Sequence, residues 1–200
     1  MDQYIALATR TESQIPQVVI NPHLLEQLLR AYINLGNVLD TVKKNVFYGK
    51  DIDASLQTER LTDTLGCVAG LVGQRFDVDA EPLKIDPRMF HSVVGIATES
   101  TELVEAIFNA EFRNQPFDTV NMVEELFDVL WYVLVAHDAT NQKLENTLNM
   151  GFAKLQKRFP DKFTSEYAIN RDVHSERQVL ESYVGNGEQD VREETNKTSS

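Results

Sequence analysis

Cysteine, basic residues and long apolar runs are all scarce in this chain of 200 residues. A single cysteine, Cys67, excludes an internal disulfide framework and a zinc site built on several thiolates. No apolar run approaches the roughly 18 residues that a membrane-spanning helix needs. The N-terminus also lacks the basic and apolar regions of a secretory signal. We therefore expect a soluble, cytoplasmic protein.

The shortage of basic residues limits the possible partners. Lys and Arg number 19 against 31 Asp and Glu, which leaves a formal net charge of −12. Nucleic-acid surfaces need clustered cations, and an anionic membrane repels an acidic protein, so we expect neither partner. An acidic protein that handles a phosphorylated ligand usually needs metal cations between itself and the phosphates.

Helical periodicity dominates the hydrophobic pattern. Apolar residues recur at steps of three and four, and no segment shows the sustained alternation of a half-buried strand. Asn21 before Pro22 is typical of a helix N-cap followed by proline at the first helical position. The pattern predicts an all-α fold with helices at about 23–46, 55–72, 87–112, 119–137, 141–159 and 165–183.

The layout suggests five consecutive segments. We expect a lead-in over 1–22, a helical hairpin over 23–76, a linker over 77–88, an acid-bearing half over 89–184 and a disordered tail over 185–200. The linker is rich in proline and charge, and the tail is small and polar.

The two hairpins resemble each other in sequence. Moving residues 34–69 forward by 65 positions aligns identical residues in similar surroundings. This match fits a tandem duplication, and convergence of two amphipathic hairpins is the alternative. The aligned identities are Phe47 with Phe112, Asp53 with Asp118, Glu59 with Glu124, Leu61 with Leu126, Asp63 with Asp128, Leu65 with Leu130 and Val68 with Val133.

Two carboxylate pairs mark the second hairpin. Glu99 and Glu102 lie three residues apart in one predicted helix, and Glu125 and Asp128 repeat that spacing in the next. Residues at this spacing share a helix face, so an antiparallel hairpin can bring the pairs together. Converging carboxylates repel one another unless cations intervene, and oxygen ligands suit Mg²⁺ or Mn²⁺.

Two simpler explanations of these acids stay open. Acidic pairs at this spacing are common on solvated helix faces, and acids also favour the first turn of a helix. The apolar surroundings of the second pair favour the metal site, because unpaired buried carboxylates are costly. No Lys or Arg lies between Arg113 and Lys143 to neutralise that pair locally.

The ordered acidic motifs resemble those of the all-α nucleoside triphosphate pyrophosphohydrolases, the MazG-like superfamily, and most closely its small phage-type members. That family's signature is E-x-x-E on one helix and E-x-x-D on the next. Residues 91–103 and 118–132 resemble the two motif helices, and residues 154–163 resemble the family's C-terminal region. The resemblance implies a MazG-like helical bundle, with the two tandem hairpins packed as a pseudo-dimer.

The resemblance also implies an activity and a set of roles. The activity is Mg²⁺-dependent hydrolysis of a nucleoside triphosphate to the monophosphate and pyrophosphate, with Mn²⁺ as a possible substitute. The expected assembly is a homo-oligomer, or a monomer whose two halves replace the dimer. The expected metal ligands are Glu99, Glu102, Glu125 and Asp128, with Glu102 or Glu125 activating water; the expected substrate contacts are Asn121, Lys154 and Arg158.

The chain departs from the family pattern in ways that motivate a second hypothesis. Thr101 and Phe127 stand where family members usually have glycine. Under the shift of 65, the first hairpin has Asn34, Asn37 and Arg60 in place of Glu99, Glu102 and Glu125. The alternative function is a catalytically silent helical module that binds a nucleotide or a host protein.

Overall fold

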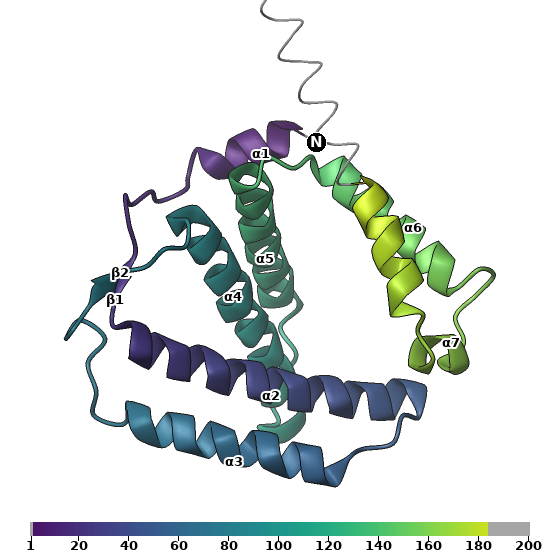
Figure 1. Ribbon diagram of the computed structural model, residues 1–200, viewed down its shortest axis with the longest axis horizontal. Helices are drawn as coiled ribbons and strands as arrows, with labels where there is room; N and C mark the ends of the chain where they lie inside the picture. Colours follow the sequence, from purple (N-terminus) through teal and green to yellow (C-terminus); the bar gives the residue numbers. More distant parts are fainter. Residues whose placement is uncertain (1, 184–200) are drawn as a thin grey trace, which may run out of the picture. The chain divides into compact units, whose positions relative to one another are not determined.

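The computed structural model describes residues 2–183, and nearly all regular structure in that range is helical (Figure 1). The all-α prediction is confirmed. The elements are α1 (Asp2–Thr9), β1 (Val19–Ile20), α2 (Pro22–Tyr48), α3 (Ala54–Leu71), β2 (Glu81–Pro82), α4 (Pro87–Phe112), α5 (Thr119–Ala139), α6 (Leu144–Arg158) and α7 (Ser165–Ile169), followed by helical residues 173–183.

The chain divides into two compact units. One consists of the described parts of residues 1–18, 84–152 and 179–200, and the other of residues 19–83 and 153–178. The first unit contains the packed pair α4 and α5, with α1 against α5. The second contains the packed pair α2 and α3, together with the two-residue antiparallel ladder of β1 and β2.

This division differs from the one suggested by the sequence. Residues 153–178 belong to the unit of the first hairpin, whereas the sequence places them in the half 89–184. They join that unit because α7 contacts α2 and the ring of Phe163 lies 5.6 Å from that of Tyr48. The domain boundaries, the pseudo-dimer and the oligomeric state stay predictions.

Side-chain caps define where the four long helices begin. The Asn21 side chain accepts hydrogen bonds from the backbone N–H groups of His23 and Leu24, with Pro22 in the first turn, which confirms the predicted cap. Asp86 caps α4 in the same way. A capping oxygen satisfies N–H groups that the first helical turn leaves without partners. Helices α3 and α5 use Asp53 and Asp118 for the same purpose.

The starts of the helices in the two pairs follow the same shift of 65 residues as the sequence identities. Helices α2 and α4 begin at Pro22 and Pro87, and α3 and α5 begin at Ala54 and Thr119. Both differences are 65 residues (87 − 22 and 119 − 54). The local structure therefore agrees with the duplication hypothesis, in which both copies keep their caps while their internal residues diverge.

The core of the first unit forms where α1 meets α5. Val135 is fully buried there, and Ala8 and Leu134 complete the buried cluster. Ile5 and Trp131 pack against it. Helix α1 lies within the segment 1–22 for which the sequence suggested only a lead-in, so the N-terminus contributes to the core.

Two predicted segments differ from the structure. The single helix expected over 165–183 is interrupted, since α7 ends at Ile169 and the next helical residues begin at 173. The interruption places Arg171 against Glu176, with 2.6 Å between their closest atoms. The linker expected over 77–88 contains β2, which pairs with β1. The expected disordered tail over 185–200 lies outside the described residues.

The length and hydropathy of the helices decide whether they could span a membrane. Within residues 2–183, none is both long and apolar enough to cross a bilayer.

A glycine controls how closely α4 and α5 approach. Gly95 is buried, and a Cβ atom there would collide with the ring of Tyr132. We expect Gly95→Ala to lower the free energy of unfolding by about 1–3 kcal/mol, because the ring or the helix must move. Gly36→Ala is the matched control, since nothing lies within 4 Å of a Cβ there. Gly36→Ala should raise the free energy of unfolding by about 0.5–1 kcal/mol, because alanine has the higher helix propensity.

Denaturant unfolding of both variants tests this. Equal stabilities of Gly95→Ala and Gly36→Ala would contradict the proposed close packing of α4 against Tyr132.

Candidate metal centre

Three of the predicted acidic side chains meet between α4 and α5. Glu99 and Glu102 project from α4 and Glu125 from α5, and one potential ligand atom from each lies within 4.8 Å of the others. The i, i+3 spacing places the α4 acids on one face, and the packing of α5 against α4 brings the third to them. Glu125 is only 6% exposed, Glu99 is half-buried and Glu102 is exposed.

The cluster is electrostatically uncompensated. Burial raises the pKa of the Glu125 carboxyl above its ordinary value, and the negative charges of Glu102 and Glu99 raise it further. Asp128 and Glu124 add smaller effects in the same direction. Within residues 2–183, no Lys, Arg or His forms an ion pair with any acid of the cluster.

Asp128 flanks the cluster. Its carboxylate is outside the set of three converging ligand atoms, but its charge contributes to the raised pKa of Glu125. The charge of Asp128 also raises the pKa of Tyr132. Burial is the largest cause of that shift, and the charge of Glu99 is the next. The fourth predicted ligand is therefore near the site.

The residues present fit a hard divalent cation. Carboxylate oxygens are the ligands that Mg²⁺ and Mn²⁺ prefer, and a cation would relieve both the repulsion and the raised pKa of Glu125. The cluster could therefore bind a metal, and the identity of the ion and the fourth ligand stay predictions.

Asn121 lies in the first turn of α5, one turn before Glu125. Its backbone N–H donates to Asp118, which is the N-cap of this helix. Asn121 does not itself cap α5, because the aspartate three residues earlier accepts the free N–H groups. Its proposed contact with substrate stays a prediction.

The two positions where the family usually has glycine carry exposed side chains. Phe127 is 60% exposed on α5. Thr101 is also exposed, and its hydroxyl donates to the carbonyl of Ala97 one turn earlier on α4.

The predicted phosphate contacts, Lys154 and Arg158, belong to the other compact unit. Lys154 is half-buried. The guanidinium of Arg158 donates two hydrogen bonds, of 2.7 and 2.6 Å, to the carboxylate of Glu176. Arg158 and Arg171 together lower the pKa of Glu176 to about 2. In this conformation Arg158 supports its own unit, and its role in substrate binding stays a prediction.

An apolar pocket of about 290 Å³ adjoins the acids within the first unit. Thr98 lines it and bonds to Glu99, and the pocket wall includes Tyr132. The His91 ring meets that of Tyr132 edge-on at 5.3 Å, and His91 Nδ1 is buried without a hydrogen-bond partner. The pocket thus combines aromatic surface with a free polar atom. From the N-terminal segment it is lined by Ser13, Ile15 and Val18.

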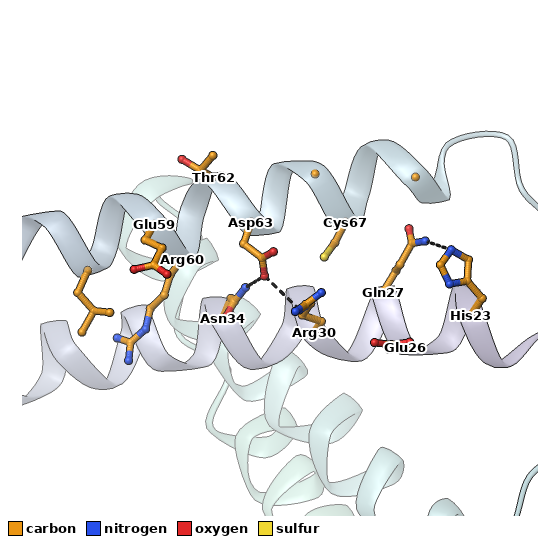
Figure 2. A pocket seen from close by; sticks show the side chains of 13 residues that line it. His23, Glu26, Gln27, Arg30, Asn34, Glu59, Arg60, Thr62, Asp63 and Cys67 are labelled. Atoms are coloured by element: carbon orange, nitrogen blue, oxygen red, sulfur yellow. Dashed lines mark hydrogen bonds and ion pairs between the residues drawn. The ribbon is translucent and has the colours of Figure 1, made fainter.

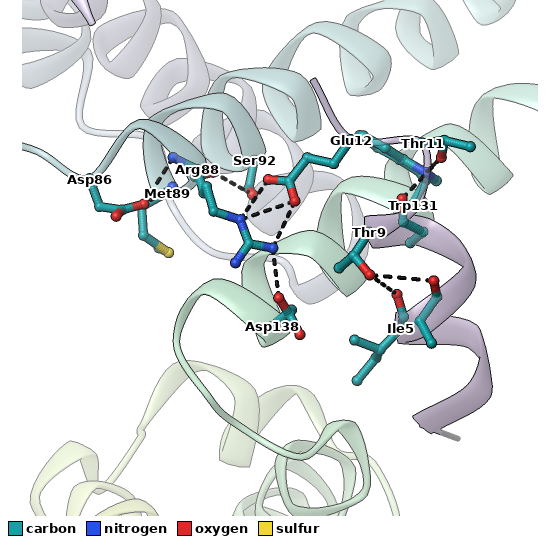
Figure 3. Close-up of polar contacts among 12 residues, drawn as sticks. Ile5, Thr9, Thr11, Glu12, Asp86, Arg88, Met89, Ser92, Trp131 and Asp138 are labelled. Atoms are coloured by element: carbon teal, nitrogen blue, oxygen red, sulfur yellow. Dashed lines mark hydrogen bonds and ion pairs between the residues drawn. The ribbon is translucent and has the colours of Figure 1, made fainter. Parts of the chain in front are cut away.

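An ion pair with a buried carboxylate and a hydrogen bond hold that N-terminal segment in place (Figure 3). Arg88 of α4 makes a two-pronged contact with the fully buried carboxylate of Glu12 and also reaches Asp138 at 2.7 Å. The indole of Trp131 donates to the hydroxyl of Thr11. Sequence reasoning missed this anchor, because residues so distant along the chain carry no local signal of their pairing.

The geometry defines a class of protein: it is helical, and an acidic cluster suited to a divalent cation lies between two packed helices. Residues 92–163 match the model of the MazG nucleotide pyrophosphohydrolase domain family. The matched segment contains all three converging acids. Comparison with curated proteins and with solved structures finds no match for the chain.

The raised pKa of Glu125 makes stability depend on pH when metal is removed. The folded state holds the Glu125 proton more tightly than the unfolded chain does, because glutamates in an unfolded chain have a pKa of about 4.3. Stability should therefore fall as the pH rises from below that value through the raised pKa of Glu125. Glu125→Gln should remove this loss and melt above wild type at neutral pH in EDTA.

Thermal unfolding across pH, with and without Mn²⁺, measures the effect. Added Mn²⁺ should stabilise wild type more than Glu125→Gln. Glu111→Gln, an exposed change on α4, is the control and should keep the wild-type profile. If Glu125→Gln also keeps that profile, the cluster is not electrostatically strained.

Proposed function

We propose that this protein hydrolyses a nucleoside triphosphate to the monophosphate and pyrophosphate with Mg²⁺, or Mn²⁺ in its place. The observation that carries the proposal is the convergence of Glu99, Glu102 and Glu125, without a compensating cation among the described residues, inside the segment that matches the MazG family model. Those three acids would hold the metal, and Asp128 beside them would be the fourth ligand.

The reaction breaks the bond between the first and second phosphates of the substrate. A bound divalent ion would neutralise phosphate charge and favour the ionised form of a water molecule. Glu102 or Glu125 would accept the proton of that water, because both carboxylates converge with Glu99 at the metal centre. The new bond joins the water oxygen to phosphorus, pyrophosphate leaves, and the water proton passes to the carboxylate.

The pocket beside the acids would receive the base. Its aromatic and apolar lining suits a flat heterocycle, and His91 Nδ1 offers the one buried side-chain atom of this pocket that lacks a partner. Asn121 would contact the sugar or base, and Lys154 and Arg158 would contact phosphate oxygens. For Arg158 this requires sharing its guanidinium with Glu176.

Product analysis over a panel of NTPs and dNTPs tests the activity. Glu102→Gln and Glu125→Gln should each lower kcat by about 100-fold or more, because each removes a ligand or proton acceptor. Glu111→Gln should retain wild-type turnover. Pyrophosphate release that needs Mg²⁺ and disappears in both cluster variants supports the proposal.

The same assay separates the alternative function. Tight nucleotide binding without turnover in wild type would instead support the catalytically silent module, for which the exposed Phe127 at a family glycine position is the motivating feature.

A change of pocket size tests where the base binds. Val94 lines the pocket, so Val94→Phe should raise KM severalfold by narrowing it, while leaving Mn²⁺-induced thermal stabilisation intact. Val93→Phe is the matched control, because Val93 is 55% exposed and lies outside the pocket lining. Equal KM values for the two variants would place the base elsewhere.

A further inference from the structure

The helix pair α2 and α3 lacks the three carboxylates of the metal centre at the corresponding positions and has one cation there. Under the shift of 65, Asn37 takes the place of Glu102, and Arg60 takes that of Glu125. The third cluster acid, Glu99, corresponds to Asn34, so three carboxylates become two amides and a guanidinium. The helix starts follow the same shift, so these positions also correspond in structure.

A hollow of about 300 Å³ lies at this place in the second unit. Asn37 and Lys44 of α2, Lys50 of the connecting turn and Arg60 of α3 contribute to its lining. These side chains offer one amide and three cationic groups. The carboxylates that share the hollow are Asp40, Asp51 and Asp53.

Two of those carboxylates are already engaged. Both oxygens of Asp40 are taken by Lys43 and Lys44. Asp53 accepts hydrogen bonds from the backbone of Ser55 and Leu56 and from the Ser55 hydroxyl as the cap of α3.

Arg60 and Lys50 retain unused binding capacity. Within residues 2–183, neither forms an ion pair with a carboxylate, and Arg60 makes only a 3.4 Å hydrogen bond to Gln57. Arg60 exerts a weak electrostatic effect on Asp53. Arg60 is a half-buried residue, and it also lines the adjoining groove of α2 and α3. A partly buried guanidinium with free N–H groups is the usual partner of a phosphate.

The neighbouring acid does not compete for Arg60. Figure 2 shows Asp63, the counterpart of Asp128, turned between Asn34 and Arg30 at a different point along the groove. Asn34 donates to Asp63 over 2.7 Å. Arg60 extends from α3 toward α2 away from this network.

We propose that the hollow between α2 and α3 is a second binding site, which takes a phosphate-bearing anion without a metal ion. Arg60 and Lys50 hold the anion and Asn37 donates to it, whereas Lys44 lines the hollow but is paired with Asp40. The metal centre and this hollow thus bind the same chemical class in opposite ways, one through a cation and the other directly. The site goes beyond the proposed hydrolysis and does not depend on it.

Calorimetry of the full chain in EDTA tests the site. Inorganic pyrophosphate is the first probe, with orthophosphate and AMP as separate arms that distinguish a free anion from a nucleotide phosphate. Arg60→Ala and Lys50→Ala should each weaken binding by about tenfold, the usual effect of losing a hydrogen bond to a charged group. Arg75→Ala is the matched control, because Arg75 is exposed, pairs with Asp77 and lies outside the hollow.

The outcomes separate this site from the metal centre. Pyrophosphate or AMP binding in EDTA that persists in Glu125→Gln and falls in Arg60→Ala and Lys50→Ala supports the proposal, whether or not the protein hydrolyses a triphosphate. Absence of binding by all three probes in EDTA overturns it. Binding that both variants leave at the wild-type level overturns it as well, and unchanged melting temperatures exclude misfolding as the cause of any loss.

Discussion

Repulsion among carboxylates is the constraint on which the metal centre depends. Glu125 is buried in the contact of α5 with α4, and the acids nearest to it raise its pKa rather than neutralise its charge. Such an arrangement is stable only if the rest of the unit compensates for it or a cation binds. The close approach of Tyr132 to Gly95 and the buried cluster around Val135 belong to the same unit as the acids.

The N-terminal segment also shapes the pocket beside the acidic cluster. Its residues form one wall of the space beside the acids, and the buried pair of Glu12 with Arg88 fixes their path. Removing Arg88 would leave the fully buried carboxylate of Glu12 without its ion-pair partner, so this contact favours one position for the segment. The metal ligands and the pocket therefore depend on contacts between parts of the chain far apart in sequence.

Much of this arrangement could be predicted from local patterns. The apolar periodicity and the Asn-Pro step at 21–22 located α2 to α5 within a few residues, because caps and helix faces are properties of short segments. The spacing of the acids placed Glu99 and Glu102 on one face for the same reason. Helix α1 was missed because its helicity depends on packing against α5, which no local pattern encodes.

Other features required the tertiary structure. The break between α7 and residue 173 follows from long-range demands on Glu176, which pairs with two arginines from different segments. The sequence shows that Arg60 takes the place of an acid, but it could not predict that Arg60 and Lys50 line one hollow between α2 and α3.

The sequence by itself determined an all-α chain, its helix starts and the two carboxylate pairs at helical spacing, because these depend on residue type and spacing within one or two helices. Only the tertiary structure decided which acids converge, which side chains form the pocket and which basic residues are already paired. Those outcomes depend on distances between separate helices, and such distances are set by packing across the whole unit.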